Sequence, residues 1–77
     1  MAVGAYVLLN ISGPHTREAV TKIKKVKGVR SAHLVAGPYD LIAFVEGNDQ
    51  KQIGELVITG IRKTQGVTNT VTCFVVS

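Results

Sequence analysis

The feature that most constrains the fold of this chain is an internal repeat of its two halves. Lys27-Gly28-Val29 follows one amphipathic segment, and Gln65-Gly66-Val67 follows a second one about half a chain later. In each half an apolar, strand-like segment precedes the amphipathic segment, and another follows the glycine. Two strand–helix–strand halves with right-handed crossovers form a split βαβ sandwich. The repeat therefore predicts an α+β, ferredoxin-like βαββαβ fold.

Composition and periodicity place the individual elements. Apolar and β-branched residues predict four strands, over residues 3–11, 29–36, 40–46 and 67–76. Apolar residues at helical spacing predict one helix from His15 to about Val26, and a second helix after a cap at Asn48 or Asp49. The first and third strands are the most continuously apolar, so we expect them in the centre of the sheet with the other two at its edges.

The first predicted strand, Val3 to Ile11, is apolar on both of its faces. In this fold the helices cover only one face of the sheet, so something outside the chain has to cover the other. The chain is 45% hydrophobic over only 77 residues, and a core of that size rarely supplies more than about 3–5 kcal/mol. We therefore expect a sheet-to-sheet homodimer, a dimeric α/β barrel, as the smallest stable unit.

Length and composition exclude several classes of protein. The chain, residues 1–77, is expected to form a single domain. It has no apolar run near the roughly 18 residues of a membrane span, and its first residues lack the pattern of a signal peptide. Its single cysteine, Cys73, cannot form an internal disulfide and is expected as a small buried hydrophobe. We expect a cytoplasmic protein with no metal site and no cofactor.

The net charge is +4, and the basic residues gather near the ends of the two predicted helices. They are Lys22, Lys24, Lys25, Lys27, Arg30, Arg62 and Lys63. The helix dipole favours cations at the end of a helix, so the preferred interpretation is that these residues form an ordinary solvent-exposed face. A nucleic-acid patch is the alternative, although no aromatic residue interleaves with these lysines.

The strongest candidate for a site is the turn that leads into the third strand. Gly37 and Pro38 suit a tight turn, but Asp40 places a carboxylate at the start of an apolar strand, where it needs a donor or water. One interpretation is that Asp40 bonds nearby amides in the turn. The other is that turn amides bind a ligand carboxylate while Asp40 pairs with a ligand ammonium. That pairing would suit an amino acid.

Other polar residues give weaker signals. Thr70 and Thr72 share one face of the fourth strand, where they either reflect β-propensity or line a polar pocket. His15 and His33 lack a second ligand or nucleophile at useful spacing, so we expect both at the surface or rim, with no catalytic residue in the chain.

Three segments in register resemble the effector domain of the Lrp/AsnC (feast/famine) regulators. They are residues 25–29, 35–41 and 66–72, read as KVKGV, VAGPYDL and GVTNTVT. The resemblance covers essentially the whole chain. It implies a domain of the RAM type that dimerises through its sheets and assembles into octamers or similar rings. It also implies that a small effector, commonly an amino acid, binds between dimers near the turn. Carried over, this implicates Gly37, Tyr39 and Asp40, together with Thr70 and Thr72.

The sequence departs from the usual family pattern at its start. Family members usually carry an N-terminal helix-turn-helix domain, whereas here the first strand begins at Val3. We therefore expect a stand-alone effector domain without sequence-specific DNA binding of its own, able to join full-length relatives. A small dimeric α/β-barrel enzyme of oxygenase or isomerase type, or an ACT-like amino-acid-binding regulator, are the alternatives.

Overall fold

The computed structural model describes residues 2–77 and confirms the predicted order of elements. The strands are β1 (Val3–Ile11), β2 (Val29–Leu34), β3 (Leu41–Gly47) and β4 (Val67–Phe74). The helical elements are the 3₁₀ turn η1 (Gly13–His15), α1 (Thr16–Lys24), α2 (Gln50–Leu56) and the π-helical turn η2 (Val57–Ile61). Only the bounds shift: α1 and β2 each end two residues earlier than expected, as does β4.

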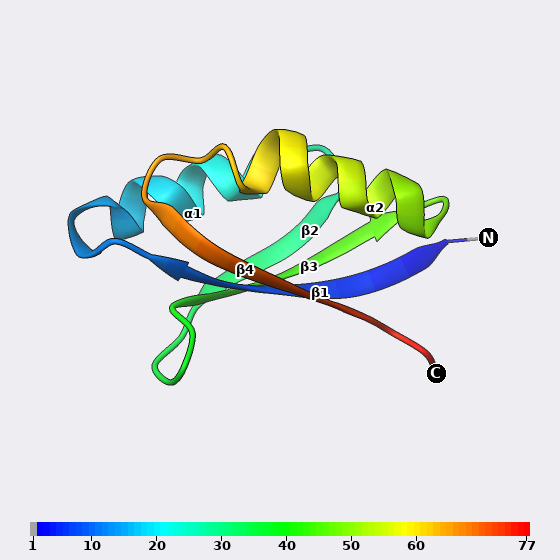
Figure 1. Ribbon diagram of the computed structural model, residues 1–77, viewed down its shortest axis with the longest axis horizontal. Coiled ribbons are helices and arrows are strands. Elements are labelled where there is room, and N and C mark those ends of the chain that lie inside the picture. Colours follow the sequence, from blue (N-terminus) through cyan, green and yellow to red (C-terminus); the bar gives the residue numbers. More distant parts are fainter. Residues whose placement is uncertain (1) are drawn as a thin grey trace.

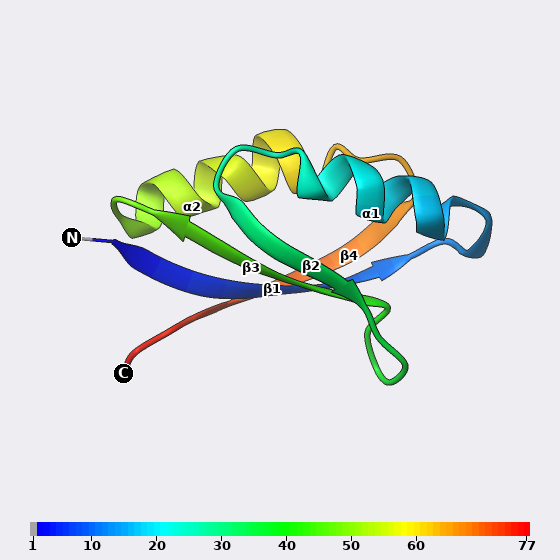
Figure 2. The same ribbon diagram turned by 180° about the vertical axis from the view of Figure 1, so that it is seen from behind.

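The four strands form one antiparallel sheet in the order β2-β3-β1-β4. The two central strands are the ones predicted from their apolar character. Both helices lie on the same face of this sheet, and the opposite face is bare (Figures 1 and 2). The ferredoxin-like fold class is therefore confirmed. No helix within residues 2–77 has the length and apolar character needed to cross a membrane.

The internal repeat corresponds to a matching pair of backbone hydrogen bonds. The N–H of Ser12 donates to the carbonyl of Gly66 over 2.8 Å, and the N–H of Glu46 donates to the carbonyl of Gly28 over 2.9 Å. Each bond ties the end of a central strand to the glycine that opens an edge strand. Both glycines have left-handed backbone conformations, with φ of +100° at Gly28 and +96° at Gly66, which explains the residue type at these positions.

Successive side chains along each strand point to opposite faces of the sheet, as the period of a β-strand requires. The face under the helices holds the core, and its largest fully buried side chains are Leu9, Ile23, Leu41, Ile53, Ile61, Val7 and Val45. The register places Tyr6 opposite Phe44 on the bare face, where their rings lie 5.0 Å apart. Tyr6 is 47% exposed there. The bare face is therefore apolar yet uncovered by the described part of the chain.

The fourth strand presents two threonines to the helix side of the sheet, and Val71 and Cys73 to the bare side. Thr70 pairs with Leu9 and Thr72 with Val7, so both threonines lie on the helix side of the sheet. Val71 and Cys73 pair with Leu8 and Tyr6 on the bare side. Cys73 is exposed, so the prediction that it is buried is wrong for this chain, because its alternating position faces away from the core.

The second helix begins as its sequence predicts. Asp49 is the N-cap, and its side chain accepts a hydrogen bond from the N–H of Gln52 over 2.7 Å. The helix continues into the π-helical turn, where a Cβ added to Gly60 would lie 2.7 Å from Cγ1 of Val26. This small residue therefore lets the second helical segment approach the end of α1 closely.

Candidate ligand site at the β2–β3 turn

The turn between β2 and β3 is closed by backbone hydrogen bonds at its base. The N–H of Val35 donates to the carbonyl of Asp40, and the N–H of Asp40 donates to the carbonyl of Leu9, each over 2.9 Å. The turn extends from the sheet on the side away from the helices (Figures 1 and 2). Residues 36–38 are exposed, whereas Tyr39 and Asp40 are half-buried. The tip is thus open to another molecule, while its base is fixed to β1.

The Asp40 side chain takes part in fixing that base. Its Oδ2 accepts a hydrogen bond from the N–H of Ile11 over 2.8 Å. Regular pairing of β1 with β4 is interrupted between Asn10 and Ile11, so the carboxylate accepts from an N–H at the irregular end of the strand. The interpretation that Asp40 bonds an amide is therefore confirmed in part, although the amide belongs to the neighbouring strand rather than to the turn.

Asn10 is a site residue that the sequence reasoning missed. Its Nδ2 donates to the carbonyl of Pro38 over 3.0 Å, and its Oδ1 accepts from Nδ2 of Asn69 over 3.4 Å. The side chain thus joins the turn to β1 and β4. The available signal was an amide between Leu9 and Ile11 in an otherwise apolar strand.

Several polar groups of the turn are left free by this network. The N–H groups of Gly37 and Tyr39 donate no hydrogen bond within residues 2–77. Oδ1 of Asp40 likewise accepts none from that part of the chain. Two free donors next to a partly free carboxylate can bind a carboxylate and an ammonium group of one small molecule.

The predicted threonines do not join this arrangement within one chain. Thr70 and Thr72 are half-buried on the helix side of β4, whereas the turn extends on the other side of the sheet. Thr70 instead lines a hollow of about 280 Å³ together with Arg62 and Thr68. The structure therefore separates the predicted site into two parts, one on each side of the sheet.

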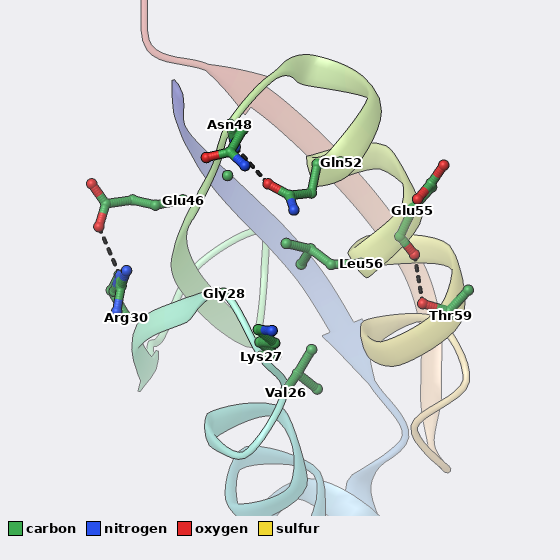
Figure 3. A pocket seen from close by; sticks show the side chains of 11 residues that line it. Val26, Lys27, Gly28, Arg30, Glu46, Asn48, Gln52, Glu55, Leu56 and Thr59 are labelled. Carbon is green, nitrogen blue, oxygen red and sulfur yellow. Dashed lines mark hydrogen bonds and ion pairs between the residues drawn. The ribbon is translucent and has the colours of Figure 1, made fainter. Parts of the chain in front are cut away.

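A hollow of about 700 Å³ lies at the opposite end of the sheet from the turn. In Figure 3, Leu56 lies between one wall with Arg30 and Glu46 and another with Glu55 and Thr59. The Nε of Arg30 donates to Oε1 of Glu46 over 2.8 Å. None of the predicted site residues lines this hollow.

Neither histidine belongs to a group of potential metal ligands within residues 2–77. His33 is exposed, and His15 is half-buried beside Gly66, where an added Cβ would lie 2.5 Å from the Cβ of His15. No group of three or more His, Cys, Asp or Glu side chains in residues 2–77 is arranged to hold a metal ion. The expectation that both histidines lie at the surface or rim agrees with these positions.

Comparison with known proteins gives a consistent set of matches. The sequence profile of the Lrp/AsnC ligand binding domain matches residues 4–77. The uncharacterized HTH-type transcriptional regulator PH1916 of Pyrococcus horikoshii is 38% identical over 71 residues, which are 88% of this chain and 47% of that protein. The chain thus spans about half the length of the curated relatives it matches.

Solved structures share the whole fold. TTHA0845 from Thermus thermophilus is 29% identical with a TM-score of 0.92, and the match covers 97% of this chain and 94% of that one. The complex of transcriptional regulator NMB0573 from Neisseria meningitidis with L-Met has a TM-score of 0.86 at 19% identity, covering 97% of this chain and 50% of that one. At that identity the second match shows the fold alone.

Proposed function

This chain belongs to the Lrp/AsnC ligand binding domain family, and we propose that it senses a free amino acid at the β2–β3 turn. In this proposal the ligand carboxylate binds the N–H groups of Gly37 and Tyr39, and the ligand ammonium pairs with Oδ1 of Asp40. The occupied turn then changes how copies of the domain, or full-length regulators of the family, assemble. The role is regulatory rather than catalytic, and we place it in the cytoplasm.

The observation that carries this proposal is the set of unused groups at the turn. Fold-forming bonds use the N–H groups of Val35 and Asp40 and one oxygen of the Asp40 carboxylate. The two free N–H groups flank Pro38, which has none to offer. A charge-assisted contact at each end of a zwitterion would fix its orientation. The L-Met complex of a protein with this fold supports an amino acid as the ligand class.

The bare face of the sheet supports a homodimer. Tyr6, Phe44 and Val71 lie on this face, and Val71 is 37% exposed. Cys73 of β4 lies on the same face, opposite Tyr6. A contiguous apolar face of this kind is typical of an interface. We propose that a second copy covers it, sheet to sheet.

A complete ligand site would then require more than one copy. Thr70 and Thr72 lie on the helix side of their own sheet, so any contribution from them to a ligand at the turn has to come from another copy. We propose that dimers associate into a ring in which the turn of one dimer meets β4 of the next. This arrangement would couple ligand binding to the size of the assembly.

Calorimetric titration with each standard L-amino acid tests the ligand assignment. Asp40→Asn is the informative variant, because its amide oxygen can still accept from the N–H of Ile11 while the negative charge is lost. A charge-assisted hydrogen bond contributes roughly 1.5–3 kcal/mol, so we expect affinity to fall about 10- to 150-fold.

Asp49→Asn is the matched control. It removes the same charge at the N-cap of α2, and asparagine caps helices equally well. Affinity should be unchanged in this variant. The proposal is contradicted if no amino acid binds the wild-type chain at millimolar concentration, or if the Asp40 and Asp49 variants bind a proven effector equally.

A further inference from the structure

The cations of this chain are concentrated on one part of its surface. Six of the nine Lys and Arg residues lie between residues 17 and 30, in α1, the turn after it and the start of β2. They are Arg17, Lys22, Lys24, Lys25, Lys27 and Arg30, and all six are exposed. The only acidic residue in the same segment is Glu18. The net positive charge of the protein is therefore localised.

Four acidic residues lie elsewhere in the chain, and two of them, Glu46 and Glu55, line one hollow together with Lys27 and Arg30 of this surface. Asp40 is bonded to the N–H of Ile11, and Asp49 caps α2. Within residues 2–77 the one ion pair joins Arg30 to Glu46, and it uses only Nε of the guanidinium. The lysines of the segment therefore have no carboxylate partner in the described part of the chain.

Along α1 the cations lie on the side opposite the core. Ala19 and Ile23 are buried, whereas Arg17 and Lys24 fall two helical turns apart on the outer side, about 10 Å along the axis. The helix dipole accounts for Lys24 in the last turn. It disfavours Arg17 in the first turn and does not reach Arg30 beyond the helix. The helix dipole alone therefore does not explain the row of six cations from Arg17 to Arg30.

A hollow of about 330 Å³ continues the row at the edge of the sheet. It is lined by Lys24 and by five consecutive residues of the edge strand β2, Val29 to His33. Arg30, Ser31 and His33 supply polar groups there, and no carboxylate lines it. Lys24 belongs to α1 and also lines this hollow, so the hollow adjoins the cations of the helix. Figure 2 shows the end of α1 leading over a turn into β2.

We propose that the outer side of α1 and this hollow form a docking surface for the phosphate backbone of a nucleic acid. A duplex carries a charge every ~3.4 Å along each strand, and a row of exposed cations can contact several phosphates. Such contacts position the duplex without reading its sequence. The surface belongs to the helix layer, so pairing of the bare sheet faces leaves it accessible.

The test is fluorescence anisotropy of a short labelled DNA duplex of mixed sequence, titrated with the chain at increasing KCl concentrations. Each phosphate contact contributes roughly 0.9 to the slope of log affinity against log salt. The combined variant Arg17→Ala/Lys24→Ala/Lys25→Ala should therefore reduce the magnitude of the slope by about 2 to 3. The matched control Lys51→Ala/Arg62→Ala/Lys63→Ala removes three exposed cations from the second half of the chain, and its slope should stay at the wild-type value.

Three results would overturn the proposal. The first is that the wild-type chain does not bind the duplex at low salt. The second is that both triple variants reduce the slope of log affinity against log salt by the same amount, which would make net charge the cause. In the third, poly-glutamate of matched charge displaces the duplex as well as unlabelled DNA does, which would assign the surface to acidic protein segments. Circular dichroism of each variant establishes that it is folded before its affinity is compared.

Discussion

The Asp40 carboxylate accepts the N–H of Ile11 across 29 positions of sequence, at 2.8 Å. This contact extends the link between β1 and β3 past the last regular pair, Leu9 with Leu41. It also leaves the second carboxylate oxygen at the turn where we place the ligand. One side chain thus fixes the base of the turn and faces the proposed site.

The first prediction separates these two roles through stability. Asp40→Ala removes the acceptor and leaves the part-buried N–H of Ile11 unpaired, which should lower the free energy of unfolding by about 1–3 kcal/mol. Asp40→Asn keeps an acceptor of similar length and should recover most of that loss. Urea denaturation of the two variants and the wild type measures both effects. Equal stability of the alanine variant and the wild type would contradict a structural role for this contact.

The second prediction concerns assembly through the bare face. Val71→Lys places a charge on that face and should shift the protein towards monomer at concentrations where the wild type is dimeric. Ile58→Lys is the control, since Ile58 is 55% exposed on the π-helical turn, on the opposite side of the sheet. Sedimentation velocity gives the species present.

The melting temperature provides a second measure of the same dimer. Because a ligand or subunit that binds only the folded state stabilises it by mass action, the wild-type melting temperature should rise with protein concentration. The Val71→Lys variant should lose this dependence and the Ile58→Lys variant should keep it. A wild-type chain that sediments as a monomer at every concentration would exclude the sheet-to-sheet dimer.

The third prediction uses two glycines of one helical segment. A Cβ at Gly54 would meet no atom within 4 Å, so Gly54→Ala should raise the free energy of unfolding by up to about 1 kcal/mol. A Cβ at Gly60 would lie 2.7 Å from the stiff side chain of Val26, so Gly60→Ala should destabilise by about 1–3 kcal/mol. Thermal melts of both variants check the opposite signs.

The parts of the fold that could be predicted depend on local pattern. The repeat of Gly28 and Gly66 marks the two places where a helical segment is followed by an edge strand, and both glycines have positive φ. The apolar character of β1 and β3 fixes their central positions. Each glycine motif and each apolar run can be recognised from a few neighbouring residues.

The parts that were missed depend on contacts between distant segments. Asn10 reaches Pro38, 28 positions away, and nothing in the sequence of the turn identifies that partner. The side of the sheet taken by Thr70 follows from its pairing with Leu9, and a shift of one residue would reverse it. The ligand role of Gly37, Tyr39 and Asp40 stays a prediction.

The last prediction uses Cys73 as a reporter of the bare face. Its side chain is exposed in the single chain and lies opposite Tyr6 on the face that we assign to the dimer interface. Burial in a dimer should slow its reaction with a thiol reagent, and the rate should rise on dilution as dimers dissociate. The Val71→Lys variant should react at the fast rate at every concentration, whereas Ile58→Lys should follow the wild type. A wild-type rate that is fast and independent of concentration would mean that the bare face is not covered by a second copy, because no other element of the described chain lies over Cys73.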